Sequence, residues 1–85
     1  MNALYILQSE KTGRYYIGST TDFNNRIIKH NAGLVLSTKA YKPWKVVFMQ
    51  DYAVYSDARK AELKIKGYKR RDYIEKIVQS GQMIL

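Results

Sequence analysis

Eighty-five residues are enough for one hydrophobic core and too few for two, so we expect a single domain over residues 1–85. The chain has no cysteine and one histidine, which excludes disulfides, thiolate zinc sites and an all-nitrogen metal site, and leaves oxygen ligands for any metal. Fifteen Lys and Arg against seven Asp and Glu give a formal charge of +8, which favours polyanionic partners such as polyphosphates.

The first half of the chain predicts a β-hairpin followed by a helix. Two short β-prone runs lie at residues 4–7 and 15–17, and a turn-forming stretch at residues 9–13 separates them. Thr20 or Thr21 is expected to cap a helix that holds Asp22 in its first turn and ends before Gly33. Residues 34–43 are expected to form a basic loop.

The second half predicts one strand and two helices. Pro43 leads into a third strand at residues 44–49. Ser56 is expected to cap a helix that runs to about Lys66 and ends at Gly67, and a last amphipathic helix is expected from Arg70 to about Ser80. The order is ββαβαα, an α+β fold in which helices flank a small, mainly antiparallel three-stranded sheet.

The basic excess makes nucleic acid the leading partner, because its field extends over a Debye length of about 8 Å at physiological salt. A solvated basic surface without a specific partner and an anionic membrane surface stay as alternatives. No apolar run approaches the roughly 20 residues that cross a bilayer, and the N-terminus lacks a secretory signal pattern. We therefore expect a cytoplasmic protein without a membrane span.

Two tyrosines of the predicted hairpin are candidate catalytic groups. Strand alternation places Tyr5 and Leu7 on one side of the first strand and Tyr16 and Gly18 on one side of the second, so Tyr5 and Tyr16 are expected to meet. The alternative is a structural pair, since tyrosine is a good strand former and cross-strand aromatic pairs stabilise sheets.

On the first helix, Asp22, Arg26 and His30 recur every four residues, so Arg26 and His30 point the same way. One interpretation is a solvated face, on which Asp22 and Arg26 form an exposed ion pair that contributes less than about 1 kcal/mol. The other is an arginine beside the only histidine, both facing a phosphate. The sequence leaves the two open.

Glu62 is the most unusual residue of the predicted helix that starts at Ser56. Ala58, Ala61 and Ile65 form its apolar stripe, and Glu62 falls inside that stripe. Burying an unpaired carboxylate is costly, so Glu62 must meet a basic group, a hydrogen-bond donor or a metal ion. A structural salt bridge is one interpretation. The other is a ligand to Mg²⁺ or Mn²⁺, since Mg²⁺ binds one or two protein carboxylates together with water and phosphate.

Basic residues gather in two stretches and predict a groove for a nucleic-acid backbone, whose contacts position the strand without reading its sequence. The first stretch contains Lys39, Lys42 and Lys45. The second stretch contains Lys64, Lys66, Lys69, Arg70 and Arg71.

These positions together resemble the GIY-YIG nuclease superfamily, in particular its small bacterial single-domain members, over nearly the whole chain. The first family motif corresponds to Ala3-Leu4-Tyr5 and the second to Tyr16-Ile17-Gly18. Arg26 and the following His30-Asn31-Ala32-Gly33 resemble the arginine-bearing helix of the family. Glu62 falls where the family places its metal-binding glutamate.

The resemblance implies roles for five residues. The tyrosine matching Tyr5 is proposed in related enzymes to act as general base on the attacking water, assisted by those matching Tyr16 and His30. The residue matching Arg26 steadies the phosphate, and the glutamate matching Glu62 holds Mg²⁺. A phenol titrates near pH 10, so Tyr5 needs positive charge nearby to act as a base at neutral pH, and Arg26 and the metal are expected to supply it.

The resemblance also has departures. Ala3 replaces the glycine of the first motif and no asparagine follows Asn31. We also expect no added DNA-binding domain of the kind that many family nucleases have. We predict a metal-dependent endonuclease for nucleic acid, DNA foremost, in DNA repair or processing. A catalytically silent nucleic-acid-binding module, serving nucleic acid or a larger repair complex, is the alternative, and a protein-interaction domain is a third interpretation.

Overall fold

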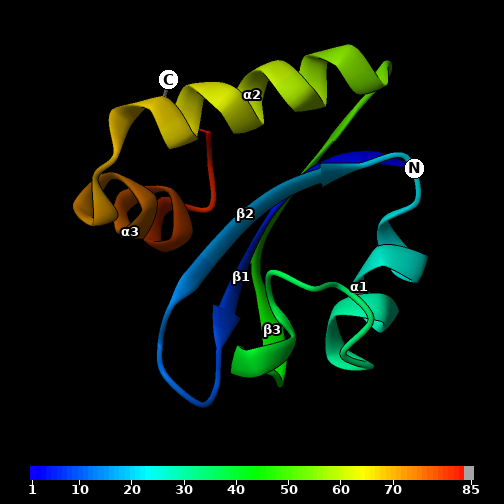
Figure 1. The fold of residues 1–85 in the computed structure, drawn as a ribbon. Coiled ribbons are helices and arrows are strands. Elements are labelled where there is room, and N and C mark those ends of the chain that lie inside the picture. Colours follow the sequence, from blue (N-terminus) through cyan, green and yellow to red (C-terminus); the bar gives the residue numbers. More distant parts are fainter. Residues whose placement is uncertain (84–85) are drawn as a thin grey trace.

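The computed structural model describes residues 1–83 and contains one sheet and three α-helices (Figure 1). The elements in chain order are β1 (Asn2–Ser9), β2 (Tyr15–Thr20), α1 (Phe23–Asn31), the short 3₁₀ helix η1 (Lys39–Tyr41), β3 (Trp44–Tyr52), α2 (Tyr55–Tyr68) and α3 (Arg71–Ser80). The predicted order ββαβαα is confirmed. In the described residues, no helix has the length and apolarity needed to cross a membrane.

The sheet has the strand order β2-β1-β3, and both strand pairs are antiparallel. β1 is therefore central, which explains its nearly continuous run of buried residues from Ala3 to Leu7. Tyr5 pairs with Gly18 on β2 and with Met49 on β3, and the register against β3 shifts between Ile6 and Leu7. Because side chains alternate along β1, this strand contributes to a hydrophobic cluster on each face of the sheet.

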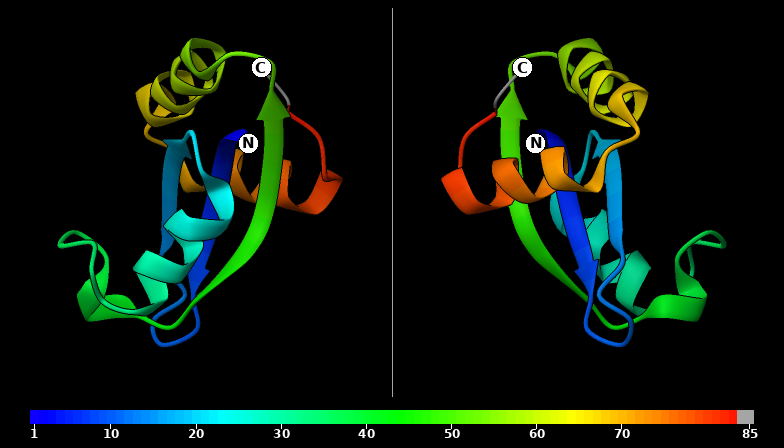
Figure 2. Two further views of the ribbon diagram at one scale, coloured as in Figure 1. Left: turned by 90° about the vertical axis from the view of Figure 1, so that its right-hand side faces the viewer. Right: turned by 90° about the vertical axis from the view of Figure 1, so that its left-hand side faces the viewer.

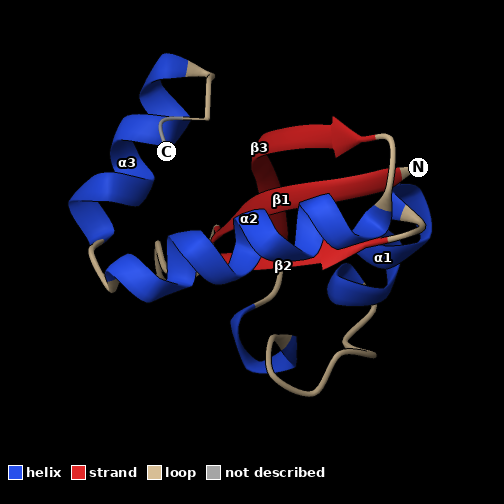
Figure 3. Ribbon diagram, turned by 90° about the horizontal axis from the view of Figure 1, so that it is seen from above, coloured by secondary structure: helices blue, strands red, loops and turns tan. Residues whose placement is uncertain are grey.

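Helices cover both faces of the sheet. The two views of Figure 2 face α1 on one side and α3 on the other, and Figure 3 shows α2 lying over β2 and β1. The core under α2 and α3 consists of Leu4, Ile6, Ile17, Phe48, Ala61, Ile65 and Ile77. The smaller cluster on the α1 side is built on Tyr5, Leu7 and Trp44. The two clusters place the odd residues of β1, Tyr5 included, on the face that α1 covers.

The start of α1 differs from the prediction, because Asp22 rather than Thr20 or Thr21 caps the helix. The Asp22 carboxylate accepts a hydrogen bond from the backbone N–H of Asn25, and the Thr20 hydroxyl accepts one from the N–H of Asp22. The helix ends at Asn31, before Gly33, as predicted. The Asn31 side chain then exchanges two hydrogen bonds with the backbone of Trp44, which ties the end of α1 to the start of β3.

The ends of α2 also differ from the prediction. The helix begins at Tyr55 with Val54 as its cap, so Ser56 lies inside the first turn. It continues through Gly67 to Tyr68, and the residue that stops it is Lys69, whose φ of 52° is left-handed. The prediction that Gly67 ends the helix is wrong, because a lysine adopts the conformation that a glycine usually supplies. The third strand reaches Tyr52, three residues beyond the predicted end.

Candidate active site

Tyr5 lies at the centre of the α1 face, and Gly18 makes room for it. The Tyr5 side chain is fully buried, and a Cβ atom on residue 18 would lie 2.5 Å from the Tyr5 hydroxyl oxygen. Any larger residue at this position would displace the phenol. The rings of Tyr5 and Tyr16 have centroids 6.3 Å apart, so the predicted meeting of the two tyrosines is seen.

His30 is the only described residue of α1 with a fully buried side chain, and both of its ring nitrogens have partners. Nε2 lies 2.9 Å from the Tyr5 hydroxyl and Nδ1 lies 2.8 Å from the Thr38 hydroxyl. The Thr38 hydroxyl also lies 3.3 Å from the carbonyl of Val35, and when its proton is donated there the hydroxyl accepts from Nδ1–H. Nε2 is then unprotonated and accepts the Tyr5 hydroxyl proton.

Arg26 lies one turn before His30 and also faces the sheet. Within residues 1–83, its Nε is buried without a hydrogen-bond partner, and no ion pair joins it to Asp22. Interaction with the Tyr5 phenol raises the pKa of the Arg26 guanidinium, so the group stays charged. The interpretation of this side of the helix as solvated is wrong, since His30 is buried while Ile28 is 66% exposed.

The environment moves the two central titrating groups in opposite directions. Burial raises the pKa of Tyr5 to about 12, although Arg26 acts to lower it. Burial, and then the positive charge of Arg26, lower the pKa of His30 to about 4. At neutral pH the pair is therefore a protonated phenol and a neutral imidazole. The expected depression of the Tyr5 pKa by Arg26 is outweighed by burial in the protein alone.

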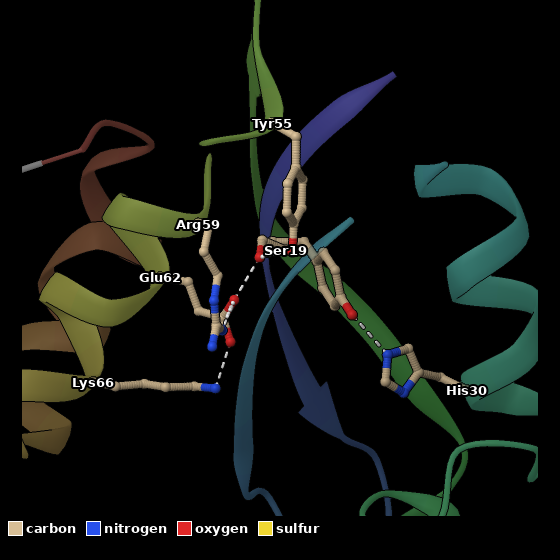
Figure 4. A network of polar contacts seen from close by, with 7 residues as sticks. Ser19, His30, Tyr55, Arg59, Glu62 and Lys66 are labelled. Atoms are coloured by element: carbon tan, nitrogen blue, oxygen red, sulfur yellow. Dashed lines mark hydrogen bonds and ion pairs between the residues drawn. The ribbon is translucent and has the colours of Figure 1, made fainter. Parts of the chain in front are cut away.

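Glu62 approaches from α2, on the other face of the sheet, and is 4% exposed (Figure 4). Its carboxylate accepts a hydrogen bond from the Ser19 hydroxyl and forms ion pairs with Arg59 and Lys66. Burial alone would raise the pKa of Glu62, but the hydrogen bonds from Lys66, Ser19 and Arg59 hold it below its usual value. The Tyr55 hydroxyl lies 3.3 Å from that of Ser19. The basic partners required by a carboxylate in the apolar stripe are thus present.

The edge strand β2 joins the two halves of this arrangement. Tyr16 and Gly18 face α1, whereas Ser19 faces α2 and Glu62. The Lys66 ammonium lies 5.9 Å from the centroid of the Tyr16 ring. The charge of Glu62 also contributes to the raised pKa of Tyr5. Tyr5, Tyr16, Arg26, His30 and Glu62 therefore share one electrostatic site around the edge of the sheet.

Comparison with known families identifies this arrangement. The GIY-YIG catalytic domain matches residues 1–76, which include all five of these side chains. The chain belongs to the GIY-YIG family.

Relatives of this GIY-YIG chain cover most of its length. A UPF0213 protein of Staphylococcus epidermidis is 39% identical over 70 residues, which are 81% of this chain and 84% of that protein. A UPF0213 protein of Streptococcus pneumoniae is 38% identical over 68 residues, 79% of this chain and 68% of that protein. The solution structure of a UPF0213 protein of Bacillus halodurans covers 92% of this chain and 82% of its own, with a TM-score of 0.59 and 29% identity.

The GIY-YIG fold separates the two predicted stretches of basic residues. Lys66, Lys69, Arg70 and Arg71 line one pocket beside β2, together with Arg14. Lys39 and Lys42 lie in and after η1, and Lys45 lies on β3 beside Gln8 of β1, so these three are outside that pocket. The Lys42 ammonium packs near Gly33 at the end of α1.

Three further side chains contact the residues of the GIY-YIG site and were not predicted from the sequence as site residues. Thr38 comes from a loop without periodicity, so nothing in its surroundings indicates that it contacts His30. Ser19 carried a signal, because strand alternation places it on the face opposite Gly18. Tyr55 is the first residue of α2 and reaches Ser19 from there. Among residues 1–83 no three His, Cys, Asp or Glu side chains gather into a metal-binding group.

Proposed function

We propose that this chain is an endonuclease that hydrolyses a phosphodiester bond in nucleic acid, DNA foremost, with the help of a divalent metal. Membership of a nuclease family and the positive charge of the chain support this assignment. The observation that carries it is the state of Arg26: a charged guanidinium whose buried Nε has no partner within residues 1–83, beside the Tyr5–His30 hydrogen bond. A buried donor without a partner is costly, and a phosphate oxygen would satisfy it.

A phosphodiester at Arg26 would lie within reach of the tyrosine pair. The guanidinium is planar and presents several donors in a fixed fork, which suits the two free oxygens of a phosphodiester. The negative charge of the phosphodiester would also offset the positive charge of Arg26, which is one cause of the low His30 pKa. Substrate binding therefore makes His30 a better proton acceptor than it is in the protein alone.

The hydrogen-bond directions define a route for the proton of the attacking water. The Tyr5 oxygen takes a proton from water while the Tyr5 hydroxyl passes its own proton to Nε2 of His30. The water oxygen bonds to phosphorus, the bond to the leaving oxygen breaks, and the leaving oxygen takes a proton from solvent. Because Tyr5 gains one proton as it loses another, it never becomes a free phenolate, which its pKa of about 12 disfavours.

Glu62 is the residue that would hold Mg²⁺ or Mn²⁺. Its neighbours Ser19 and Tyr55 present hydroxyl oxygens. Its carboxylate forms ion pairs with Lys66 and Arg59, whose side chains are 46% and 48% exposed. This donor set of one carboxylate and hydroxyls fits Mg²⁺, which retains several waters in protein sites. When bound, the metal would stabilise negative charge that develops on the phosphate.

A cleavage assay tests the proposed function. The purified chain is incubated with end-labelled single-stranded, duplex and branched DNA and with RNA, with Mg²⁺, with Mn²⁺ and with EDTA. We expect metal-dependent cleavage of at least one substrate by the wild type and none by Glu62→Gln. Glu75→Gln, which removes a half-exposed carboxylate on α3, is the matched control and should cleave normally.

The alternative of a catalytically silent binding module predicts a different result. Such a chain would bind these strands with an affinity that falls linearly with salt on logarithmic axes, and would cleave none of them. A protein-interaction domain would show neither cleavage nor salt-dependent binding of nucleic acid. The absence of cleavage in every metal and substrate combination would reject the proposed function.

A further inference from the structure

A pocket of about 340 Å³ opens beside the candidate active site, between β2 and the junction of α2 and α3. Its interior is apolar and is formed by Ile17 of β2, Ile65 of α2 and Ile74 of α3, with Tyr15 at its wall. This volume is near the low end of the roughly 300 to 1,000 Å³ typical of small-molecule sites. The pocket therefore suits one small group with an apolar face rather than a duplex.

The rim of the same pocket is positive. Its charged lining residues are all cations, and no carboxylate lines it. They are Arg14, Lys66, Lys69, Arg70 and Arg71. Arg71 is held on the wall, since its guanidinium lies 4.6 Å from the centroid of the Tyr15 ring and donates to the carbonyl of Gly13. An apolar interior under a cationic rim matches a ligand that joins a flat apolar group to an anion.

Lys69 gives a second, independent indication that the pocket binds an anionic ligand. It is the only described non-glycine residue with a positive φ, and it occupies the position that ends α2, where glycine is usual. A non-glycine residue in the left-handed region lowers the stability of the fold, so stability does not account for a lysine at this position. Lys69 forms no ion pair within residues 1–83, and it is one of the residues that line the pocket. Its ammonium is therefore available to an anionic ligand.

Lys66 connects the pocket to the candidate active site. It lines the pocket, pairs with Glu62 and lies over Tyr16. The pocket and the candidate active site therefore share Lys66 and adjoin each other along β2.

We propose that this pocket binds one unpaired nucleotide next to the scissile phosphate, with its base against Ile17, Ile65 and Ile74 and its phosphate on Lys69. A base that is paired and stacked in a duplex cannot enter such a pocket, so the substrate must offer a single-stranded nucleotide at this position. This inference rests on the proposed function, since it names the substrate strand of the same site.

Fluorescence anisotropy in EDTA tests the pocket apart from metal-dependent cleavage. Two labelled single strands of equal length are compared, one with normal bases and one built wholly of abasic sites, which carries the same phosphates. We expect the wild type to bind the normal strand roughly tenfold more tightly. Ile74→Asn, which makes the interior polar, should bring the ratio of the two affinities close to one. An unfolded fraction of the protein does not change the ratio of the two affinities, because both strands are measured with the same protein sample.

Lys69→Gly provides the complementary variant, because stability and binding should change in opposite directions. The melting temperature should rise by about 4 °C as the left-handed residue becomes glycine. Affinity for both strands should fall about threefold or more as one phosphate contact is lost. Lys60→Ala removes an exposed lysine from the same helix away from the pocket, and should change the affinity less than twofold.

Equal affinity of the wild type for the normal and abasic strands would overturn the base pocket and leave the proposed cleavage standing. Unchanged affinity in Lys69→Gly would overturn the role of Lys69 at the pocket. Base-dependent binding that Ile74→Asn removes, in a protein that cleaves nothing with Mg²⁺ or Mn²⁺, would support the pocket and reject the proposed nuclease.

Discussion

The Tyr5 hydroxyl and Nε2 of His30 share a hydrogen bond, and the two atoms lie 2.9 Å apart in a buried contact between β1 and α1. The direction of this bond depends on the tautomer of His30, and a Thr38 hydroxyl that accepts from Nδ1–H leaves Nε2 free to accept from Tyr5. A loop residue thus determines which way a proton can move between two residues of the sheet and helix.

The first prediction is that His30 is the Nδ1–H tautomer at neutral pH. The chain has one histidine, so its two ring nitrogens can be assigned directly in ¹⁵N NMR spectra. Thr38→Val removes the acceptor and should shift the population towards the other tautomer, with a cleavage rate roughly tenfold lower. A wild-type ring protonated at Nε2 would show that the Tyr5–His30 bond runs the other way.

The second prediction concerns stability at acid pH. The pKa of His30 is about 4 in the folded chain and about 6.5 when unfolded, so between these values the unfolded state binds more protons. The contribution of neutral His30 to the free energy of unfolding is therefore complete above about pH 6.5. It falls by about 2 to 3 kcal/mol as pH drops to about 4. Urea unfolding at several pH values should show a smaller acid loss in His30→Gln. Parallel pH curves for the two proteins would contradict the low pKa.

The third prediction concerns Arg26. Arg26→Ala should lower the cleavage rate by about a hundredfold or more, because it removes the charged donor that we propose binds the phosphate. The melting temperature should change little, since the residue has no ion pair within residues 1–83. Arg26→Lys should restore little, because an ammonium cannot reproduce the planar fork. Lys29→Ala, on the exposed side of α1, is the control. Near-normal turnover of either Arg26 variant would contradict the proposed role of Arg26 in cleavage.

The fourth prediction separates the two interpretations of Glu62. Glu62→Gln loses ion pairs with half-exposed Arg59 and Lys66, so without metal the variant should be about 1 kcal/mol less stable. If Glu62 also binds Mg²⁺, ion at tenfold its dissociation constant should stabilise the wild type by about 1.4 kcal/mol and leave the variant unchanged. Thermal melts with and without Mg²⁺ measure both effects. An equal response of the two proteins to Mg²⁺ would contradict metal binding by Glu62 and support the interpretation as a structural salt bridge.

The fold was largely predictable because local signals agree with one another. Alternating apolar residues, the turn at residues 9–13 and the glycine after α1 led to the observed order and sheet. The end of α2 was not predictable, since Lys69 adopts a conformation that its residue type disfavours. Helix boundaries follow local backbone energetics, and here a side chain that lines a pocket occupies the boundary.

The site was predictable in part, for a physical reason. Fourfold spacing showed that Arg26 and His30 share one side of α1, but it did not indicate that His30 is buried against the sheet together with Phe23 and Ile27. Glu62 stood out because a carboxylate is unusual in an apolar stripe, and its partners proved to be Ser19, Arg59 and Lys66. The contact of Thr38 with His30 depends on a loop path that no periodicity encodes.

The most direct test of the proposed chemistry is the single-turnover cleavage rate of Tyr5→Phe on the best substrate of the wild type, with Mg²⁺ and at neutral pH. The substitution keeps the buried ring beside Gly18 and removes only the hydroxyl that is hydrogen-bonded to His30, at a cost of about 1 kcal/mol in stability. We predict a rate at least a hundredfold lower in a variant that remains folded. A rate within threefold of the wild type, in the range of ordinary scatter for a residue outside the chemistry, would contradict the Tyr5–His30 route.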